Sequence, residues 1–511
     1  MKRMPVTLGG NLTLGDIVRA AHGAEVSIAP HVADKVGAAR EVVERAVASR
    51  LTVYGITTGI GDLANVRIDP AEARLLQRDI VRSHATAVGP SLPREVVRAM
   101  LLLKARTFAY GASGVRFEVL ERLVSFLNAK IHPVVPEQGS LGASGDLALL
   151  AHLALPIMGE GLVEVHGAVQ PSPEALRRAR IEPLDLSYKE GLSLVNGTEA
   201  MLALGILTLD RAERAAHAAD VTGAMTLEAC LGTDQAFDAR LIALRSHEGA
   251  KAVAANLRLL LADSQIVSSH RHSEHLVQDA YSLRCIPQVH GAYRGGFEYV
   301  RATLRAELAS AVDNPSVIPE KEHVASSGNF HGEALGLAAD HLALCVAGYA
   351  TIAERRIARA VDAKLNNGLP AFLTPDPGRR SGFMLAHYTA ASLTSEGRSL
   401  AHPASADSIP TSAGQEDHVS MGMTAARKAG AVLECTMRVI AVEALVAAQA
   451  IDLRGPLEPA PASAAVVRLI RTVSDFVTDD RPLAGDIEAV TERVSSGALQ
   501  AAAEDVTGPL A

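Results

Sequence analysis

Three long segments of the chain, at 199–219, 334–361 and 421–452, are rich in alanine and apolar over much of the helix circumference. Alanine and leucine lose little conformational freedom when they enter a helix, so these segments favour helices over strands. A helix that is apolar on every side belongs in the interior of a bundle, where its neighbours cover it. The segments therefore predict a mainly helical fold with buried central helices.

The length of the chain and its composition set the expected domain organisation. It has 511 residues, 48% of them apolar and 21% charged, which is enough for one large folding unit or two fused ones. Leu51–Tyr54 looks like a short strand among Gly-rich turns, whereas 114–129 has the apolar spacing of a helix. We expect a smaller mixed domain over 1–110 and a helical bundle over 111–511. The Pro-rich segment 454–461 is expected to link the bundle to short C-terminal helices.

Charge and cysteine usage limit the possible partners. The formal net charge of −8 argues against a nucleic-acid partner. The sequence has no uncharged apolar run long enough to predict a membrane span. Its first residues lack the apolar stretch of a signal peptide. The four cysteines lie far apart without a CxxC pair, which predicts reduced thiols rather than disulfides or a metal site. We expect a cytoplasmic protein with no membrane partner and no metal.

A Gly-rich loop at 139–146 reads Gly-Ser-Leu-Gly-Ala-Ser-Gly-Asp. Its glycine spacing differs from that of dinucleotide-binding loops, P-loops and hydrolase nucleophile elbows. One interpretation is a turn in which Ser144 or Asp146 caps a helix that begins near Leu147.

A second interpretation uses the three small residues Ala143, Ser144 and Gly145. The unhindered amide nitrogen of Gly145 can attack the carbonyl carbon of Ala143 if the loop is held in a strained conformation. Loss of water and of the Ser144 hydroxyl then leaves an exocyclic methylidene on an imidazolone, an electrophile that ordinary side chains do not supply. The same tripeptide also occurs at 112–114, so the tripeptide alone does not decide between the two interpretations.

The wider context of the loop, 139–152, resembles the cofactor signature of the histidine/phenylalanine/tyrosine ammonia-lyase family. Other motifs similar to that family follow in family order over roughly residues 5 to 450. They are Tyr54–Gly61, Ser83-His84, Asn196–Thr198, Gln278–Arg284, Asp313–Pro315, Gly328–His331 and Gln415–Met421. The resemblance implies a 4-methylideneimidazol-5-one (MIO) cofactor formed autocatalytically from Ala143-Ser144-Gly145. The tripeptide at 112–114 instead matches an ordinary helix start.

The resemblance also implies a fold, an assembly and a reaction class. The fold would be mainly α, an elongated helical bundle with a smaller mixed N-terminal domain, of the ammonia-lyase/fumarase-like type. The assembly would be a homotetramer whose active sites take residues from three subunits. The reaction would be non-oxidative elimination of ammonia from an L-amino acid.

Family resemblance suggests roles for individual residues. Tyr54 matches the base that removes the β-proton. Arg284 matches the carboxylate anchor, a task that suits its planar fork. Three positions match residues that hold the substrate and the cofactor carbonyl through hydrogen bonds: Asn196, Gln278 and Tyr281, of which Tyr281 is counted as catalytic. Phe330 would pack against the substrate ring or the cofactor.

Two further residues bear on the substrate. His84, in a Ser-His pair like that of histidine lyases, and Glu416 can together bind the two nitrogens of an imidazole. The resemblance therefore implies conversion of L-histidine to trans-urocanate and ammonia. His84 also suits a phenol hydroxyl, so a tyrosine ammonia-lyase or tyrosine 2,3-aminomutase is the alternative. The segment 62–67 is slightly more similar to those enzymes.

Two readings from other classes are less favoured. A non-catalytic helical assembly protein would be expected to lack the tripeptide, Tyr54 or Arg284, and all are present. An eliminase of the fumarase/argininosuccinate-lyase type would carry a GSSxMPxKxN-type loop, which this sequence lacks.

Overall fold

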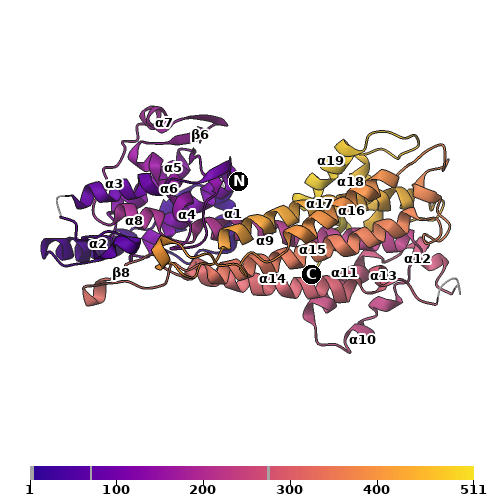
Figure 1. Ribbon diagram of the computed structural model, residues 1–511. Coiled ribbons are helices and arrows are strands. Elements are labelled where there is room, and N and C mark those ends of the chain that lie inside the picture. The colour runs from indigo at the N-terminus through magenta and orange to yellow at the C-terminus, as the bar shows by residue number, and fades with distance from the viewer. Residues whose placement is uncertain (1–4, 70–71, 273–276) are drawn as a thin grey trace. The chain divides into compact units, whose positions relative to one another are not determined.

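The computed structural model describes residues 5–69, 72–272 and 277–511 (Figure 1). The fold is mainly α, which confirms the predicted class. The chain forms two compact units, each assembled from three separated segments. Unit 1 comprises Met1–Leu207, Arg301–Asp340 and Pro403–Arg427, and unit 2 comprises Thr208–Val300, His341–His402 and Lys428–Ala511. The division into domains at residue 110 remains a prediction.

Unit 1 contains all the strands of the described chain, in four small sheets. Three sheets are two-stranded: β1 with β2 in parallel, and β3 with β5 and β8 with β9 antiparallel. The fourth has the antiparallel order β4-β6-β7. The bounds are β1 Val6–Leu8, β2 Val26–Ile28, β3 Val88–Ser91, β4 Ile131–Pro133, β5 Pro136–Gln138, β6 Leu162–Val165, β7 Ala168–Pro171, β8 Ser316–Ile318 and β9 His323–Ala325.

The helices that belong wholly to unit 1 form two main groups: α1, α2 and α5 pack against α4, whose buried positions run through nearly its whole length, and α3, α6 and α8 pack against one another. A capping box starts α1: Thr13 Oγ1 accepts from the Asp16 N–H, and the Asp16 carboxylate accepts from the Thr13 N–H. The bounds are α1 Leu14–Ala21, α2 His31–Ala48, α3 Ala73–His84, α4 Arg94–Ala109, α5 Phe117–Asn128, α6 Leu147–Ala154, α7 Ser172–Ala179 and α8 Glu190–Val195; short 3-10 turns include η1 Gly61–Asn65, η4 Pro319–Lys321 and η6 Ser412–Gly414.

Four long helices contribute residues to both units. They are α9 Glu199–Ala229, α14 Ile286–Ala309, α15 Glu333–Val361 and α17 Gly422–Asp452, and Figure 1 labels them. Three of them coincide with the Ala-rich segments, so that prediction is confirmed. Much of α17, including Val439–Ala448, is almost completely buried. The bundle interior therefore covers α17 on nearly all sides, as its composition requires, whereas α14 and α15 leave residues such as Tyr299 and Leu344 exposed.

The other helices of unit 2 are shorter and complete the bundle. They are α10 Ala239–Ile242, α11 Glu248–Leu260, α12 Gln265–Ser269, α13 Tyr281–Arg284, α16 Met384–Leu400, α18 Pro461–Arg471, α19 Ala484–Ser495 and α20 Ala498–Thr507. The segment 454–461 connects α17 to the last three, as predicted.

One helix in the described chain, α15, is long and apolar enough to cross a membrane by length and composition. Its most apolar window is 67% buried inside the structure. We therefore interpret α15 as a core helix of the bundle.

The predicted strand at Leu51–Tyr54 is wrong. These residues form an irregular turn after α2, in which the Thr57 side chain donates to the Leu51 carbonyl at 2.6 Å and accepts from the Val53 N–H at 2.9 Å. A side chain that satisfies backbone groups locally competes with strand pairing, and sequence periodicity does not reveal this. The predicted helix at 114–129 is confirmed as α5, and the four cysteines are free thiols.

Candidate active site

The Gly-rich loop connects β5 to α6 and has an unusual backbone. Gly142, Ser144 and Gly145 have positive φ angles of 85°, 51° and 80°. For the non-glycine Ser144 this conformation is strained. A Cβ atom at Gly145 would lie 2.0 Å from the Gly197 carbonyl oxygen, so only glycine fits there.

Contacts with the start of α9 hold the loop in this conformation. The Gly197 N–H donates to the Ser144 carbonyl at 3.1 Å, and the Asp146 N–H donates to the Gly197 carbonyl at 2.7 Å. The Asp146 carboxylate accepts from the N–H groups of Ala200 and Met201 at 2.9 and 3.0 Å. These donors belong to the first turn of α9, where backbone N–H groups lack helical partners.

The capping interpretation of the loop is therefore correct only in part. Asp146 precedes α6, as expected, but its side chain makes no capping bond to α6 and caps α9 instead. Burial raises the pKa of the Asp146 carboxyl to about 7, although hydrogen bonds from Met201, Ser140 and Ala200 lower it.

A cavity of about 350 Å³ opens beside this loop, wholly within unit 1. Five of the predicted site residues line it: Tyr54, His84, Ser144, Asn196 and Glu416. The other lining residues come mainly from η1, α6, α8 and η6, and Ala143 and Gly145 flank Ser144 in the chain. Segments more than 300 residues apart in the sequence thus meet at one site.

Tyr54 lies in the turn after α2 and directs its hydroxyl to the 3-10 turn η1. Its Oη atom accepts a hydrogen bond from the Gly61 N–H at 3.1 Å. This hydrogen bond fixes the position of the phenol oxygen at the cavity. The Asp62 N–H donates to Ser412 Oγ at 3.3 Å, which connects the turn beside Tyr54 to the loop that carries Glu416.

Gln77 on α3 fixes the turn that carries Tyr54. Its side chain is fully buried, donates to the Gly55 carbonyl at 3.1 Å and accepts from the Leu192 N–H at 3.0 Å. Sequence analysis missed this residue. The signal was available, since Gln77 lies at helical spacing with Ala73, Ile80 and Val81 on the buried face of α3.

His84 is the last residue of α3, and its two ring nitrogens have different environments. Nδ1 lies 2.8 Å from the Ile80 carbonyl, which can only accept, so Nδ1 carries the hydrogen. Burial lowers the pKa of the His84 imidazole, opposed by the Ile80 contact and by Glu416. The ring is then neutral at pH 7, and its Nε2 atom is a hydrogen-bond acceptor.

Glu416 supplies a second acceptor to the cavity. One oxygen of its carboxylate accepts from the Thr411 hydroxyl at 2.9 Å. The two residues belong to one local turn, in which the Thr411 N–H also donates to the Glu416 carbonyl. An ionised carboxylate has about four acceptor positions, so it keeps capacity for a ligand.

Asn196 ends α8 and has a fixed side-chain orientation. Its Nδ2 donates to the Asn314 carbonyl at 2.9 Å and to the Asp313 carboxylate at 3.3 Å. Both partners can only accept, so the amide nitrogen must lie on that side. Its Oδ1 is buried without a partner among the described residues and is available to a ligand in the cavity.

A buried charge network supports Asn196. Lys189 is fully buried and donates to Asp313 and to Ser193 Oγ, both at 2.8 Å. Burial raises the pKa of Asp313, but Lys189 outweighs this effect and the pKa is lowered overall. Lys104, also fully buried, donates to the Asn196 carbonyl at 2.5 Å. Neither lysine was singled out from the sequence, because a lone lysine in a helical segment usually lies on the surface.

The other four predicted residues do not line this cavity within the described chain. Gln278, Tyr281 and Arg284 belong to unit 2, and Phe330 belongs to unit 1. Tyr281 is 71% exposed, and the Arg284 guanidinium lies 4.7 Å from the centre of its ring. Arg284 Nε donates to the Asp279 carbonyl at 2.9 Å. Their roles remain predictions.

Known structures define the class of this fold. The tyrosine aminomutase of Streptomyces globisporus matches with a TM-score of 0.94 at 37% identity, covering 99% of this chain and 100% of that one. The histidine ammonia-lyase of Trypanosoma cruzi matches with a TM-score of 0.91 at 41% identity, covering 98% and 96%. The fold is thus that of ammonia-lyases and aminomutases.

Sequence relatives and a family model are more specific. The histidine ammonia-lyase of Symbiobacterium thermophilum is 52% identical over 99% of both chains, and that of Myxococcus xanthus is 49% identical over 98% of both. The aromatic amino acid lyase model matches residues 12–472. The chain belongs to the aromatic amino acid lyase family, and it is a carbon–nitrogen lyase that acts on an amino acid.

Proposed function

We propose that this enzyme eliminates ammonia from L-histidine to give trans-urocanate. The observation that carries the proposal is the pair of acceptors, His84 Nε2 and the Glu416 carboxylate, at the cavity that also contains Tyr54 and Ser144. The relatives at 49–52% identity are named histidine ammonia-lyase, which supports the same substrate.

The chemistry of imidazole explains why two acceptors favour histidine. A protonated imidazole ring has two N–H donors, and a neutral one has a single donor, whereas a phenyl ring has none. Phenylalanine would offer no donor to His84 Nε2 or to the acceptor positions of Glu416 that Thr411 leaves open, which disfavours its binding. We infer that these two residues select the imidazole side chain.

The residues of the Gly-rich loop fit the formation of an MIO group. The curled backbone, the positive φ of Ser144 and the absence of space for a side chain at Gly145 suit a bond from Gly145 N to the Ala143 carbonyl carbon. The former carbonyl oxygen and the Ser144 hydroxyl would leave as two water molecules. When present, this group supplies an electrophilic carbon that assists departure of the substrate amine.

The surrounding residues account for the rest of the elimination. Tyr54 accepts the β-proton of the substrate, with its oxygen positioned by the hydrogen bond from the Gly61 N–H. The Cβ–H and Cα–N bonds break, the double bond forms between Cα and Cβ, and the nitrogen leaves as ammonia. The unpartnered Asn196 Oδ1 accepts a hydrogen bond from the substrate or the cofactor.

We further propose that other copies of the chain complete the site. Arg284 suits the substrate carboxylate, and Gln278, Tyr281 and Phe330 suit the surrounding contacts, but these four do not line the cavity of their own chain. A homotetramer with shared active sites supplies them from neighbouring subunits. We expect this assembly in the cytoplasm, without a membrane or nucleic-acid partner.

A tyrosine lyase or tyrosine aminomutase is the alternative. A neutral His84 Nε2 can accept a hydrogen bond from a phenol, and a structural relative at 37% identity is named tyrosine aminomutase. In that case Glu416 would have no second donor to bind, which makes this candidate the weaker one.

The test is a near-ultraviolet assay of the purified enzyme with L-histidine, L-tyrosine and L-phenylalanine in separate reactions. We expect urocanate from histidine, loss of activity in Ser144→Ala, and a mass lower by two waters in the peptide containing 143–145. Ser113→Ala, in the second Ala-Ser-Gly tripeptide, is the matched control and should keep the two-water mass loss at 143–145, because that cyclisation does not involve Ser113. Coumarate or a β-amino acid from tyrosine would establish the alternative, and an intact 143–145 peptide in active enzyme would refute the cofactor.

A further inference from the structure

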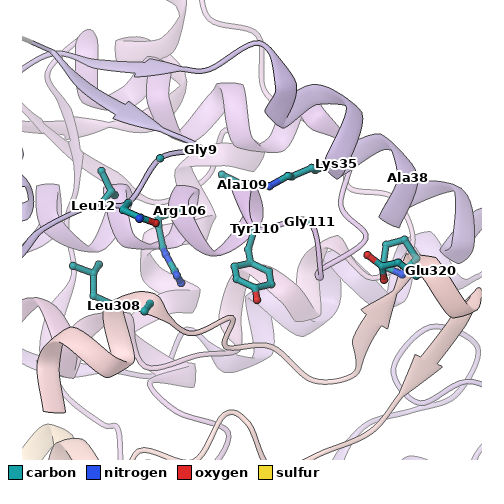
Figure 2. Close-up of a pocket in the computed structure, with 14 residues that line it drawn as sticks. Gly9, Leu12, Lys35, Ala38, Arg106, Ala109, Tyr110, Gly111, Leu308 and Glu320 are labelled. Atoms are coloured by element: carbon teal, nitrogen blue, oxygen red, sulfur yellow. The ribbon is translucent and has the colours of Figure 1, made fainter. Parts of the chain in front are cut away.

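A second cavity of unit 1, of about 750 Å³, has a volume typical of small-molecule binding sites. It lies among the loop after β1, the end of α4, the end of α14 and η4 (Figure 2). None of its lining residues lines the cavity that contains Tyr54. We name it the Arg106 cavity, after the guanidinium at one end.

Two cations line this cavity without a carboxylate partner among the described residues. Arg106 donates one hydrogen bond, to the Ser310 carbonyl, and neither Arg106 nor Lys35 forms an ion pair there. Glu199 and Glu307, whose charges act on Arg106, both bind other donors. Glu199 accepts from Lys104 and Thr107, both at 2.9 Å, and Glu307 accepts from Thr198 at 2.5 Å.

The Arg106 guanidinium is half-buried. This burial lowers its pKa, although the charges of Glu199 and Glu307 raise it. The guanidinium also lies 5.7 Å from the centre of the Tyr110 ring. A half-buried guanidinium with free N–H groups is the side chain best suited to bind a carboxylate through two parallel hydrogen bonds.

The other residues that line the cavity indicate which chemical groups a ligand would carry besides a carboxylate. Leu12 and Leu308 give apolar walls near Arg106, and Tyr110 adds its ring. In Figure 2, Lys35 and Tyr110 lie between Arg106 and Glu320. Glu320 forms no ion pair among the described residues and offers an acceptor at the far end.

We propose that the Arg106 cavity binds a small ω-amino carboxylate. Arg106 and Lys35 hold its carboxylate, the leucines and Tyr110 contact its short apolar body, and Glu320 holds its ammonium group. A dianion such as phosphate fits less well, because Glu320 would repel it and the lining has only one net positive charge. This site is independent of the proposed substrate and of the cofactor.

The test uses the absence of tryptophan from the chain. Tyr110→Trp introduces a single tryptophan at a half-exposed position of the cavity, so its fluorescence reports binding there and nowhere else. The probes are 4-aminobutyrate, butyrate and n-butylammonium, which do not absorb in the tryptophan region. We expect 4-aminobutyrate to bind most tightly, butyrate more weakly, and n-butylammonium not at all.

Variants in the Tyr110→Trp background separate the contributions. Arg106→Gln should weaken 4-aminobutyrate binding by about 10-fold or more, because it removes charge-assisted hydrogen bonds to the carboxylate. Lys35→Gln, at an exposed position that tolerates substitution, should weaken it by a smaller factor. Glu320→Gln should abolish the advantage of 4-aminobutyrate over butyrate. Arg178→Gln, on α7 and outside the cavity, should change nothing.

Circular dichroism of Arg106→Gln establishes whether the variant folds, and Lys35→Gln carries the test if it does not. The proposal is overturned if the fluorescence does not respond to any carboxylate. It is equally overturned if butyrate and n-butylammonium change the fluorescence alike. It is also overturned if folded Arg106→Gln and Lys35→Gln both bind 4-aminobutyrate as tightly as the Tyr110→Trp parent does.

Discussion

Asn196 offers the cavity a hydrogen-bond acceptor because its amide nitrogen is held by Asp313 and Asn314. The charge of Asp313 enforces this orientation, since a carboxylate accepts hydrogen bonds and cannot donate them. Lys189 in turn keeps Asp313 ionised in a fully buried position. A residue outside the cavity thereby determines which polar atom a substrate meets inside it.

Asp313→Asn tests this arrangement. An amide at 313 can donate to Asn196 and allows the Asn196 side chain to flip, so we expect kcat/KM to fall about 10-fold, the effect of one hydrogen bond of about 1.4 kcal/mol. Steady-state kinetics with the substrate measures the change. Asp79→Asn, at an exposed position of α3, is the control, and a variant as active as that control would contradict the arrangement.

Tyr54→Phe removes the proposed base and leaves the ring in position. We expect kcat to fall roughly 100- to 10,000-fold with little change in KM, the range typical of general acid–base catalysis. Tyr388→Phe, at an exposed tyrosine of unit 2, is the matched control for loss of a phenol hydroxyl. Full activity in Tyr54→Phe would show that another group takes the proton.

Asp146 predicts a pH dependence of stability. Its pKa is about 7 in the folded chain and 3.8 when exposed, so between these values the folded state keeps a proton that the unfolded state releases. Stability is therefore lost as pH rises from about 4 to about 7, by an amount on the order of 4 kcal/mol, and is constant above that range.

The measurement compares urea unfolding midpoints of the wild type and Asp146→Asn from about pH 5 to about pH 8. The asparagine cannot ionise, and its oxygen can still accept from the start of α9, so the difference between the two proteins isolates this one carboxyl. We expect the variant to gain stability relative to the wild type as pH rises. A difference that is constant with pH would contradict the raised pKa.

Within unit 2, the long helices α14 and α15 approach each other closely enough that glycine is required at one contact. A Cβ atom at Gly348 on α15 would lie 2.1 Å from the Tyr293 ring of α14. Polar groups inside the bundle are paired as well: Arg356 of α15 contacts Glu443 of α17, which also accepts from Thr222 and Thr226 of α9. These contacts fix the register of the helices.

Gly348→Ala should destabilise the protein by about 1–3 kcal/mol, the usual cost of overpacking a core. Gly485→Ala is the control, because that exposed glycine of α19 has no atom within 4 Å of the added Cβ. It should be neutral or stabilising by at most about 1 kcal/mol. Thermal unfolding of the two variants gives the comparison, and equal midpoints would mean that α14 and α15 separate without cost.

At the scale of the whole molecule, shared active sites predict complementation. Tyr54→Phe and Arg284→Met should each be inactive, but subunits of the two variants that are dissociated and reassembled together should regain activity. Random mixing restores about one site in four when the two residues come from different subunits. No recovery, in a procedure that restores the wild type, would mean that both residues serve the site of their own chain.

Local sequence patterns were sufficient for much of the fold. The Ala-rich segments became α9, α15 and α17, because apolar periodicity and helix propensity are properties of neighbouring residues. The turn at Leu51–Tyr54 was mispredicted, because its Thr57 side chain satisfies the backbone locally. The buried Gln77 and Lys189 were missed, since burial of a polar residue depends on partners that are distant in the sequence.

The helical class, the small residues of the 139–146 loop and the kinds of side chain available for chemistry can be read from the amino-acid order. The meeting of Tyr54, His84, Asn196 and Glu416 beside Ser144 depends on the folded chain, and so does the capping of α9 instead of α6 by Asp146. The difference lies in the range of the interactions. Helix propensity acts over a few residues, whereas the orientation of Asn196 and the neutral state of His84 follow from burial and from contacts between distant segments.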